Sequence, residues 1–240
     1  MTTKLLLLVA LLPALGLADL PPREVFSRKV YETLKIEAPS FAALRCDDVE
    51  FSAAQSEFNK FFGIGPEYNW RKASELDQTV MNYMRDNTTT FLKACDQRKA
   101  FYQRMAMMWD SCINRYYLIN KLGSSATNIS APFIYVAMWQ HLDFICNGGK
   151  ELALANWFDL HTFKYTDDFT KCQQNFHNSV NADPNSYCPS AQTFIHCSNK
   201  AYETFLPDKS ASVGWFICED LRVGYAYDCP DLRCYVIKSN

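Results

Sequence analysis

The chain has 240 residues, of which 48% are hydrophobic and 15% aromatic, and a formal net charge of −2 at pH 7. This composition supports a real hydrophobic core, organised as one large or two small domains. The near-neutral charge gives no electrostatic attraction to nucleic acid or to an anionic membrane, so neither is an expected partner.

The first 18 residues have the pattern of a secretory signal peptide. One basic residue, Lys4, precedes an apolar run at 5–12, and small residues stand at Gly16 and Ala18. This pattern predicts cleavage after Ala18 and export of the remaining chain. Beyond this leader, no apolar run reaches the roughly 18 to 20 residues that span a bilayer. We therefore expect a soluble protein that is secreted and extracellular.

The N-terminal part, residues 19–147, has apolar residues three or four positions apart, the spacing of amphipathic helices. The most regular stripe predicts one helix over 101–119. Another predicted helix starts at Ser130, with Pro132 in its first turn, and ends at Asn147-Gly148-Gly149. The predicted helices of this part cover 25–34, 49–62, 76–84, 101–119 and 130–146.

The C-terminal part, residues 148–240, continues the same spacing. Its predicted helices cover 151–161, 169–176, 194–205 and 214–227. No persuasive alternating strand pattern is present, so we predict an all-α, disulfide-crosslinked protein.

Ten cysteines follow the leader, and an even number in an exported chain predicts five disulfide bridges. Four precede Asn147 and six follow it. This split favours two small helical subdomains that each close their own bridges, with a single core crossed by bridges as the alternative. Cys229 and Cys234 either pair with each other or tie the tail to two different helices. The cysteines are Cys46, Cys95, Cys112, Cys146, Cys172, Cys188, Cys197, Cys218, Cys229 and Cys234.

Two sequons predict N-linked glycosylation of an exported chain, at Asn87 and Asn128. Both lie in polar stretches that resemble loops or helix ends. A glycan attached there would extend into solvent.

No catalytic motif is present, so no catalytic residue, metal or cofactor is expected. The chain lacks the Gly-x-Ser-x-Gly and His-Glu-x-x-His patterns. His141 and Asp143 are two positions apart, and residues at that spacing on a helix do not face each other, so they are poorly placed to act as an acid–base couple.

The acidic pairs at 47–48 and 167–168 are interpreted as helix caps. A zinc site formed by Cys172 and His177 with His196 and Cys197 is disfavoured because exported thiols oxidise.

Two groups of residues are candidates for binding. Met105, Met108 and Phe133 are able to line an apolar pocket, although core packing is the default interpretation of such residues. Tyr68 and Trp70 are able to anchor a partner from a loop at 63–71, or to fold against the core. A second loop, at 178–187, is a further candidate contact surface.

The cysteine spacing of the second half resembles a known family. The segments that carry the resemblance are Cys-Pro-Ser-Ala-Gln at 188–192, Phe-Ile-His-Cys at 194–197, Trp-Phe-Ile-Cys-Glu-Asp-Leu at 215–221 and Asp-Cys-Pro-Asp-Leu-Arg-Cys at 228–234. This cadence is similar to the secreted cysteine-rich domain of unknown function that is expanded in nematodes. The resemblance implies an extracellular disulfide scaffold and no known activity.

The sequence favours a secreted, glycosylated binding protein whose partner is an extracellular protein or a glycan. The first alternative is a carrier of an apolar, lipid-like small molecule. An unrecognised secreted hydrolase that depends on His141 is the third.

Overall fold

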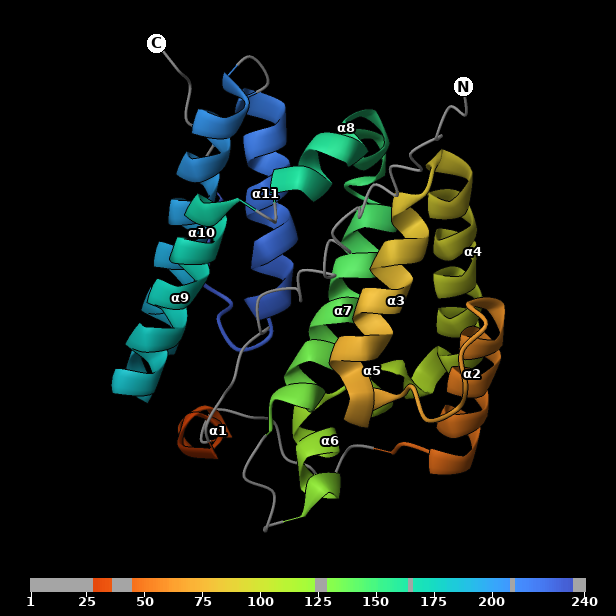
Figure 1. Cartoon of the computed structure of the whole chain (residues 1–240). Coiled ribbons are helices and arrows are strands. Elements are labelled where there is room, and N and C mark those ends of the chain that lie inside the picture. Colours follow the sequence, from red (N-terminus) through yellow and green to blue (C-terminus); the bar gives the residue numbers. More distant parts are fainter. Residues whose placement is uncertain (1–27, 36–44, 124–128, 164–165, 208–209, 235–240) are drawn as a thin grey trace, which may run out of the picture.

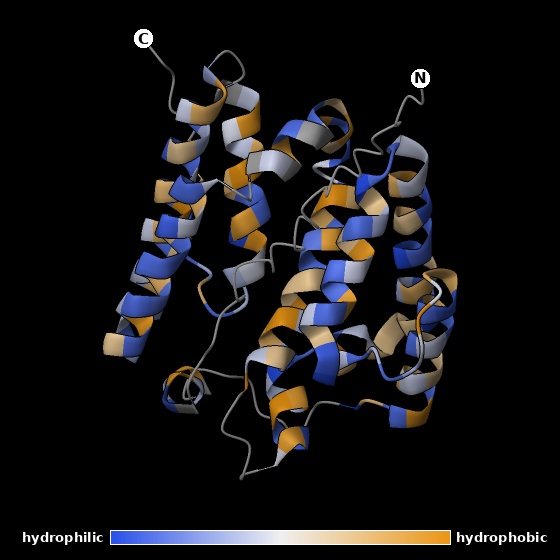
Figure 2. Ribbon diagram, viewed as in Figure 1, coloured by the Kyte–Doolittle hydropathy of each residue, from blue (hydrophilic) through white to orange (hydrophobic). Residues whose placement is uncertain are grey.

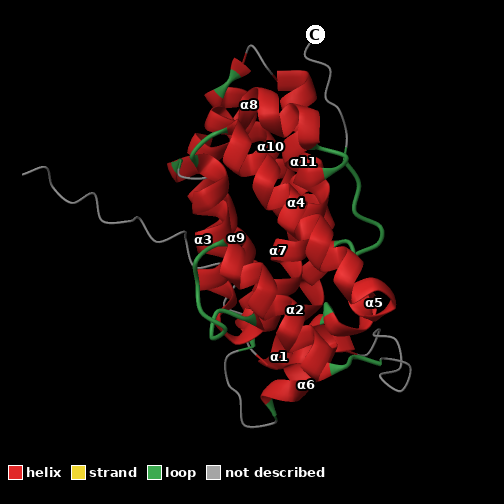
Figure 3. Cartoon of the chain, turned by 90° about the vertical axis from the view of Figure 1, so that its right-hand side faces the viewer, coloured by secondary structure: helices red, strands yellow, loops and turns green. Residues whose placement is uncertain are grey.

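The computed structural model describes residues 28–35, 45–123, 129–163, 166–207 and 210–234. The predicted signal peptide and Asn128 lie outside these ranges. Within them the chain contains helices and loops and no strand (Figure 3), so the all-α prediction is confirmed. The helices are α1 Arg28–Lys35, α2 Asp48–Phe61, η2 Trp70–Lys72, α3 Ala73–Arg85, α4 Thr88–Met105, η3 Ala106–Met108, α5 Trp109–Cys112, α6 Arg115–Leu122, α7 Ser130–Cys146, α8 Lys150–Phe163, α9 Asp167–Ala182, η4 Pro184–Ser186, α10 Tyr187–Phe205 and α11 Ser210–Tyr225.

Helix α7 lies at the centre of the fold (Figure 1). It packs against α3, α4 and α6 of the N-terminal part and against α11 of the C-terminal part. Figure 2 shows hydrophobic and hydrophilic residues alternating along most helices, as expected for helices with one buried face. The buried apolar residues of both parts form one contiguous cluster.

The contact between α7 and α11, which we call the seam, brings the two parts together. Gly149 follows α7, and a Cβ atom there would lie 2.8 Å from ring atoms of Phe144 and Phe216. These two rings, one from each part, have their centroids 5.2 Å apart. Glycine therefore permits the close approach of the chain to both rings at this point.

An aromatic group fills the N-terminal core. The rings of Phe101 and Trp139 stack at 4.2 Å with an interplanar angle of 12°, and Phe58 lies 4.9 Å from Trp139. Such contacts contribute about 0.5–1.5 kcal/mol each beyond the burial of the rings.

The predicted single helix over 101–119 is wrong. Helix α4 ends at Met105, and Ala106 has φ +43°, a conformation that interrupts an α-helix. A second break follows at Asn114, whose side chain caps α6 by accepting hydrogen bonds from Tyr116 N and Tyr117 N. The stripe therefore belongs to the end of α4 and to three short elements, η3, α5 and α6, in place of one helix. Val49, which the stripe of α2 placed inward, is 80% exposed because it lies in the first turn, beside the cap.

The acidic pairs lie at helix starts, as predicted. The side chain of Asp47 caps α2 through Val49 N (2.9 Å) and Glu50 N (3.1 Å). Asp167 and Asp168 occupy the first turn of α9, where Thr166 is the capping residue. Carboxylates at these positions also interact favourably with the positive end of the helix dipole.

All ten cysteines are paired, and every bridge closes within one part of the chain. No bridge crosses residues 147–149. Cys229 pairs with Cys188 of α10 and Cys234 with Cys218 of α11, so the tail is tied to two different helices. The five pairs are Cys46–Cys112, Cys95–Cys146, Cys172–Cys197, Cys188–Cys229 and Cys218–Cys234.

Candidate functional site

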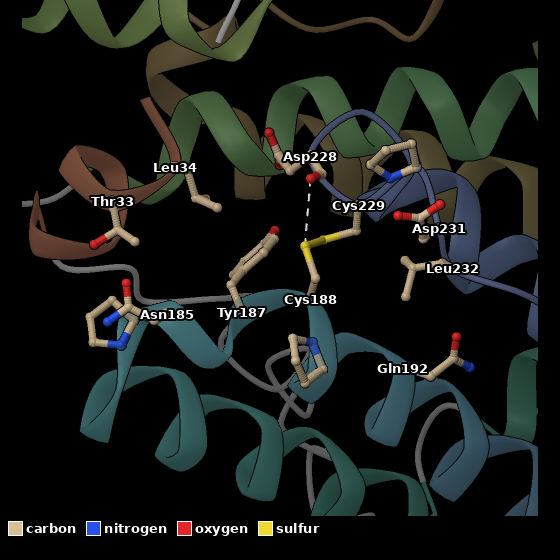
Figure 4. A pocket seen from close by; sticks show the side chains of 13 residues that line it. Thr33, Leu34, Asn185, Tyr187, Cys188, Gln192, Asp228, Cys229, Asp231 and Leu232 are labelled. Carbon is tan, nitrogen blue, oxygen red and sulfur yellow. Dashed lines mark hydrogen bonds between the residues drawn. A yellow bond between two sulfur atoms is a disulfide. The ribbon is translucent and has the colours of Figure 1, made fainter. Parts of the chain in front are cut away.

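A cavity of about 660 Å³, which we call the larger cavity, lies between α1, the start of α10 and the segment that follows α11 (Figure 4). Its volume falls within the roughly 300–1,000 Å³ typical of ligand sites. The lining residues are Thr33, Leu34, Pro184, Asn185, Tyr187, Cys188, Pro189, Gln192, Asp228, Cys229, Pro230, Asp231 and Leu232.

The walls of the larger cavity are held by covalent and conformational constraints. The Cys188–Cys229 bridge joins the wall made by α10 to the wall made by the tail. Each of these cysteines is followed by a proline, Pro189 or Pro230, whose ring fixes φ. The Sγ atom of Cys188 lies 3.5 Å from the carbonyl oxygen of Asp228 (dashed line in Figure 4).

A pair of hydrogen bonds fixes the tail along α10. The side chain of Gln192 donates to the carbonyl oxygen of Arg233 (3.2 Å) and accepts from its backbone N–H (3.1 Å). At the other end of the cavity, Asp183 caps η4 by accepting from Asn185 N at 3.0 Å. Hydrogen bonds within the protein therefore fix the backbone at both ends of the larger cavity without a ligand.

The acidic groups of the lining have different roles. Asp231 is fully exposed at the rim. Asp228 is buried and forms an ion pair with Arg115, and both side chains are 2% exposed. The hydroxyl of Tyr116 donates to the other carboxylate oxygen at 2.8 Å. Burial, together with the negative charge of Asp228, raises the pKa of Tyr116, so the phenol stays protonated and remains a donor.

Arg115 also lines a second space of about 150 Å³, which we call the smaller cavity. It lies between the loop from α5 to α6, helix α7 and the end of α11. The remaining lining residues are Trp109, Asp110, Ile113, Asn114, Val136, Gln140 and Tyr227.

The three residues predicted to line an apolar pocket lie in the hydrophobic core or pack against it. Met105 and Phe133 are 0% and 1% exposed, respectively, and Met108 is half-buried. None of the three lines the larger or the smaller cavity. Their burial agrees with the core interpretation of these residues.

Trp70 is only 7% exposed, and η2, whose first residue it is, packs against α7. The guanidinium of Arg71 covers its ring at 4.0 Å. Tyr68 is half-buried, and its carbonyl accepts a 2.7 Å hydrogen bond from the buried Asn59 side chain, which fixes the loop. Of the second predicted loop, 178–187, most is helical, but Pro184, Asn185 and Tyr187 line the larger cavity.

Asn87 is exposed and caps α4. Its Oδ1 accepts from Thr90 N at 3.0 Å, and the Thr90 hydroxyl accepts from Asn87 N at 3.0 Å, so the two residues form a capping box. Its Nδ2, the atom that would carry a glycan, donates to Asp86 at 2.8 Å.

His141 and Asp143 point to different helices, as residues two apart on a helix should. His141 Nδ1 pairs with Asp220 of α11, and Asp143 pairs with Arg98 of α4 at 2.5 Å. The first of these pairs joins the two parts across the seam. Sequence reasoning missed both partners because they lie on distant helices.

Within the described ranges, no group of three metal-ligating side chains could hold an ion, and no helix combines the length and apolarity needed to cross a membrane. Comparison of the chain with family models, curated protein sequences and solved structures gave no match.

Proposed function

We propose that the protein is exported and acts outside the cell as a binding protein, with the larger cavity receiving an extended segment of another protein. The observation that carries the proposal is the cavity itself, whose opposite walls are joined by the Cys188–Cys229 bridge. A site that is rigid before binding loses little conformational entropy when the ligand arrives.

The chemistry of the lining supports a polypeptide ligand. Pro189 and Pro230 offer exposed apolar rings, Tyr187 and Leu34 are buried in the lining (1% and 8% exposed), and Asn185 and Asp231 are exposed at the rim. No lysine, arginine or histidine is among the lining residues, and the two carboxylates already have arginine partners, Arg115 for Asp228 and Arg233 for Asp231, so neutral side chains suit the cavity best.

The pairing of all ten cysteines supports the extracellular setting, because disulfides persist in oxidising compartments. The predicted signal peptide and sequons agree with the same setting. Export and glycosylation remain part of this proposal.

The carrier of an apolar small molecule is the less favoured alternative. Such a carrier needs an enclosed apolar cavity, whereas the larger cavity includes carboxylate and amide side chains. The hydrolase alternative depends on His141. The side chain of His141 pairs with the carboxylate of Asp220, and this pair links α7 to α11.

A displayed random peptide library tests the proposal. Peptides selected on the oxidised protein should bind a Thr33→Trp variant, which places a bulky ring in the cavity and occupies part of it, at least tenfold more weakly. The matched control is Thr193→Trp, an exposed position on α10 outside the lining, which should bind as the unmodified protein does. Equal binding to the two variants, or no selected peptide, would refute the proposal.

A further inference from the structure

The smaller cavity combines two aromatic side chains with several polar ones. Trp109 is half-buried and Tyr227 is 44% exposed, and both line the space. The Trp109 ring is held by edge-to-face contacts with Tyr102 (4.9 Å) and Trp139 (5.6 Å). An aromatic wall is therefore fixed in position without a ligand.

The volume of the smaller cavity, about 150 Å³, sets the size of a ligand. A cavity of about 150 Å³ is known to admit a benzene molecule. A hexose has about twice as many non-hydrogen atoms as benzene, so the space admits only one edge or face of a single pyranose, and the rest of the ligand must lie outside it.

One polar atom of the wall has no partner. Gln140 Oε1 is buried and accepts no hydrogen bond from the described residues. A buried acceptor left in this state is destabilising, and a donor on a ligand would remove that penalty. Asn114 Nδ2 makes only a long contact of 3.4 Å with the Tyr227 hydroxyl, so it also has capacity for a better acceptor.

The charges of the wall exclude most other ligand classes. Arg115 is already neutralised by Asp228, and Asp110 adds a negative charge, so a carboxylate or phosphate has no free cation to bind. A cationic ligand would lie close to the Arg115 guanidinium. An apolar ligand would leave Gln140 Oε1 without a donor.

We propose that the smaller cavity binds one neutral pyranose ring, a hexose or N-acetylhexosamine unit of a glycan. The C–H face of the sugar packs on Trp109 or Tyr227, and its hydroxyl or acetamido groups donate to Gln140 Oε1 and Asp110 and accept from Asn114 Nδ2. This site is separate from the larger cavity and does not depend on the function proposed for it.

The test measures binding of the methyl glycosides of glucose, mannose, galactose and N-acetylglucosamine to the oxidised protein. The protein is first stripped of its own N-glycans, and ligand-observed NMR and calorimetry provide the readouts. We expect saturable binding of at least one glycoside with Kd of about 1 mM, which corresponds to about −4.1 kcal/mol.

The decisive variant is Gln140→Leu, which removes the unpartnered acceptor. It should weaken sugar binding at least tenfold while leaving the melting temperature unchanged or higher, because no hydrogen bond within the fold is lost. Gln173→Leu is the matched control, since Gln173 Oε1 on α9 is also buried and unpartnered but lies outside the cavity. This control should bind the glycoside as the unmodified protein does.

Three results would overturn the inference: no saturable binding of any glycoside, equal binding by Gln140→Leu, or tighter binding of a sialic acid glycoside than of the neutral sugars. Thr33→Trp should leave sugar binding intact. Failure of the peptide site and failure of the sugar site are therefore distinguishable.

Discussion

Arg115 and Asp228 are 113 residues apart in the chain and form a buried ion pair that links the N-terminal part to the segment after α11. Arg115 lines the smaller cavity and Asp228 the larger one, so the pair is a shared wall of the two spaces. Its geometry is completed by Tyr116, which donates to the carboxylate, and by the carbonyl of Gly224, 3.4 Å from the guanidinium.

Breaking this pair should destabilise the protein strongly. Asp228→Asn leaves the Arg115 charge buried without its counter-ion, and we expect the free energy of unfolding to fall by about 3–5 kcal/mol. The double variant Arg115→Met with Asp228→Leu should lose less than Asp228→Asn alone, because no unpaired charge remains. Urea unfolding without reductant measures both values.

The control is Lys171→Met, which breaks an exposed pair with Asp168 and should lower the free energy of unfolding by less than about 1 kcal/mol. A similar loss for this control and for Asp228→Asn would contradict the prediction.

The disulfide pattern predicts what a single cut between the two parts should release. A protease recognition sequence inserted between the exposed residues Asn147 and Gly148 interrupts the chain where no bridge crosses. After cleavage, the two fragments should remain associated through the seam under native conditions. In denaturant without reductant they should separate on non-reducing electrophoresis. A single covalent species under those conditions would show that at least one bridge joins the two parts.

Asn87 has two roles, as helix cap and as predicted glycan acceptor, and substitutions can separate them. Asn87→Ala removes both and should lower the free energy of unfolding by about 1 kcal/mol through loss of the cap. Asn87→Ser retains a capping side chain without the acceptor amide. Thr89→Ala disrupts the sequon but leaves the capping box with Thr90 intact. On unglycosylated protein, both should be more stable than Asn87→Ala, and stabilities that match Asn87→Ala would refute the capping role.

The conformation of Ala106 predicts a stabilising glycine. Its φ of +43° is unfavourable for a residue with a Cβ atom, and Ala106→Gly should raise the free energy of unfolding by up to about 1 kcal/mol. Ala100→Gly, at an exposed position inside α4, should instead cost about 1 kcal/mol. Thermal unfolding of the two variants should therefore move in opposite directions. A decrease for both would contradict strain at Ala106.

Burial lowers the pKa of His177 below its ordinary value. The unfolded chain then binds a proton more readily than the folded protein does once the pH falls below about 6.5. The contribution of this group to stability is thus fully present above that pH and decreases as the solution is acidified. His177→Gln should reduce the loss of stability between about pH 7.5 and pH 5 in urea unfolding, and an unchanged pH dependence would refute the assignment.

The helices and the all-α class were predictable because each buried face repeats every three or four residues along a contiguous segment. The break at Ala106 was not, since alanine is a strong helix former and a positive φ there depends on tertiary packing. The break at Asn114 left a recognisable signal, because asparagine is one of the side chains that commonly cap the start of a helix. The apolar spacing of Met108, Cys112 and Tyr116 obscured it.

The cavities were beyond the reach of sequence patterns because their walls come from distant segments. The larger cavity needs Thr33, Tyr187 and Asp228 together, and no local periodicity relates them. One clue was present, in that both cysteines of the bridge between its walls are followed by proline. The partner of His141 was hidden for the same reason, since Asp220 lies on another helix.

The confinement of every disulfide to one side of Asn147 has a consequence for oxidative folding. If four and six thiols pair in separate groups, the number of alternative pairings falls roughly twentyfold, from 945 to 45. The first group is also complete once the chain has been synthesised through Cys146, before Cys172 has emerged. If the chain is exported as proposed, synthesis order and cysteine placement together favour native pairing over scrambling in the oxidising compartment.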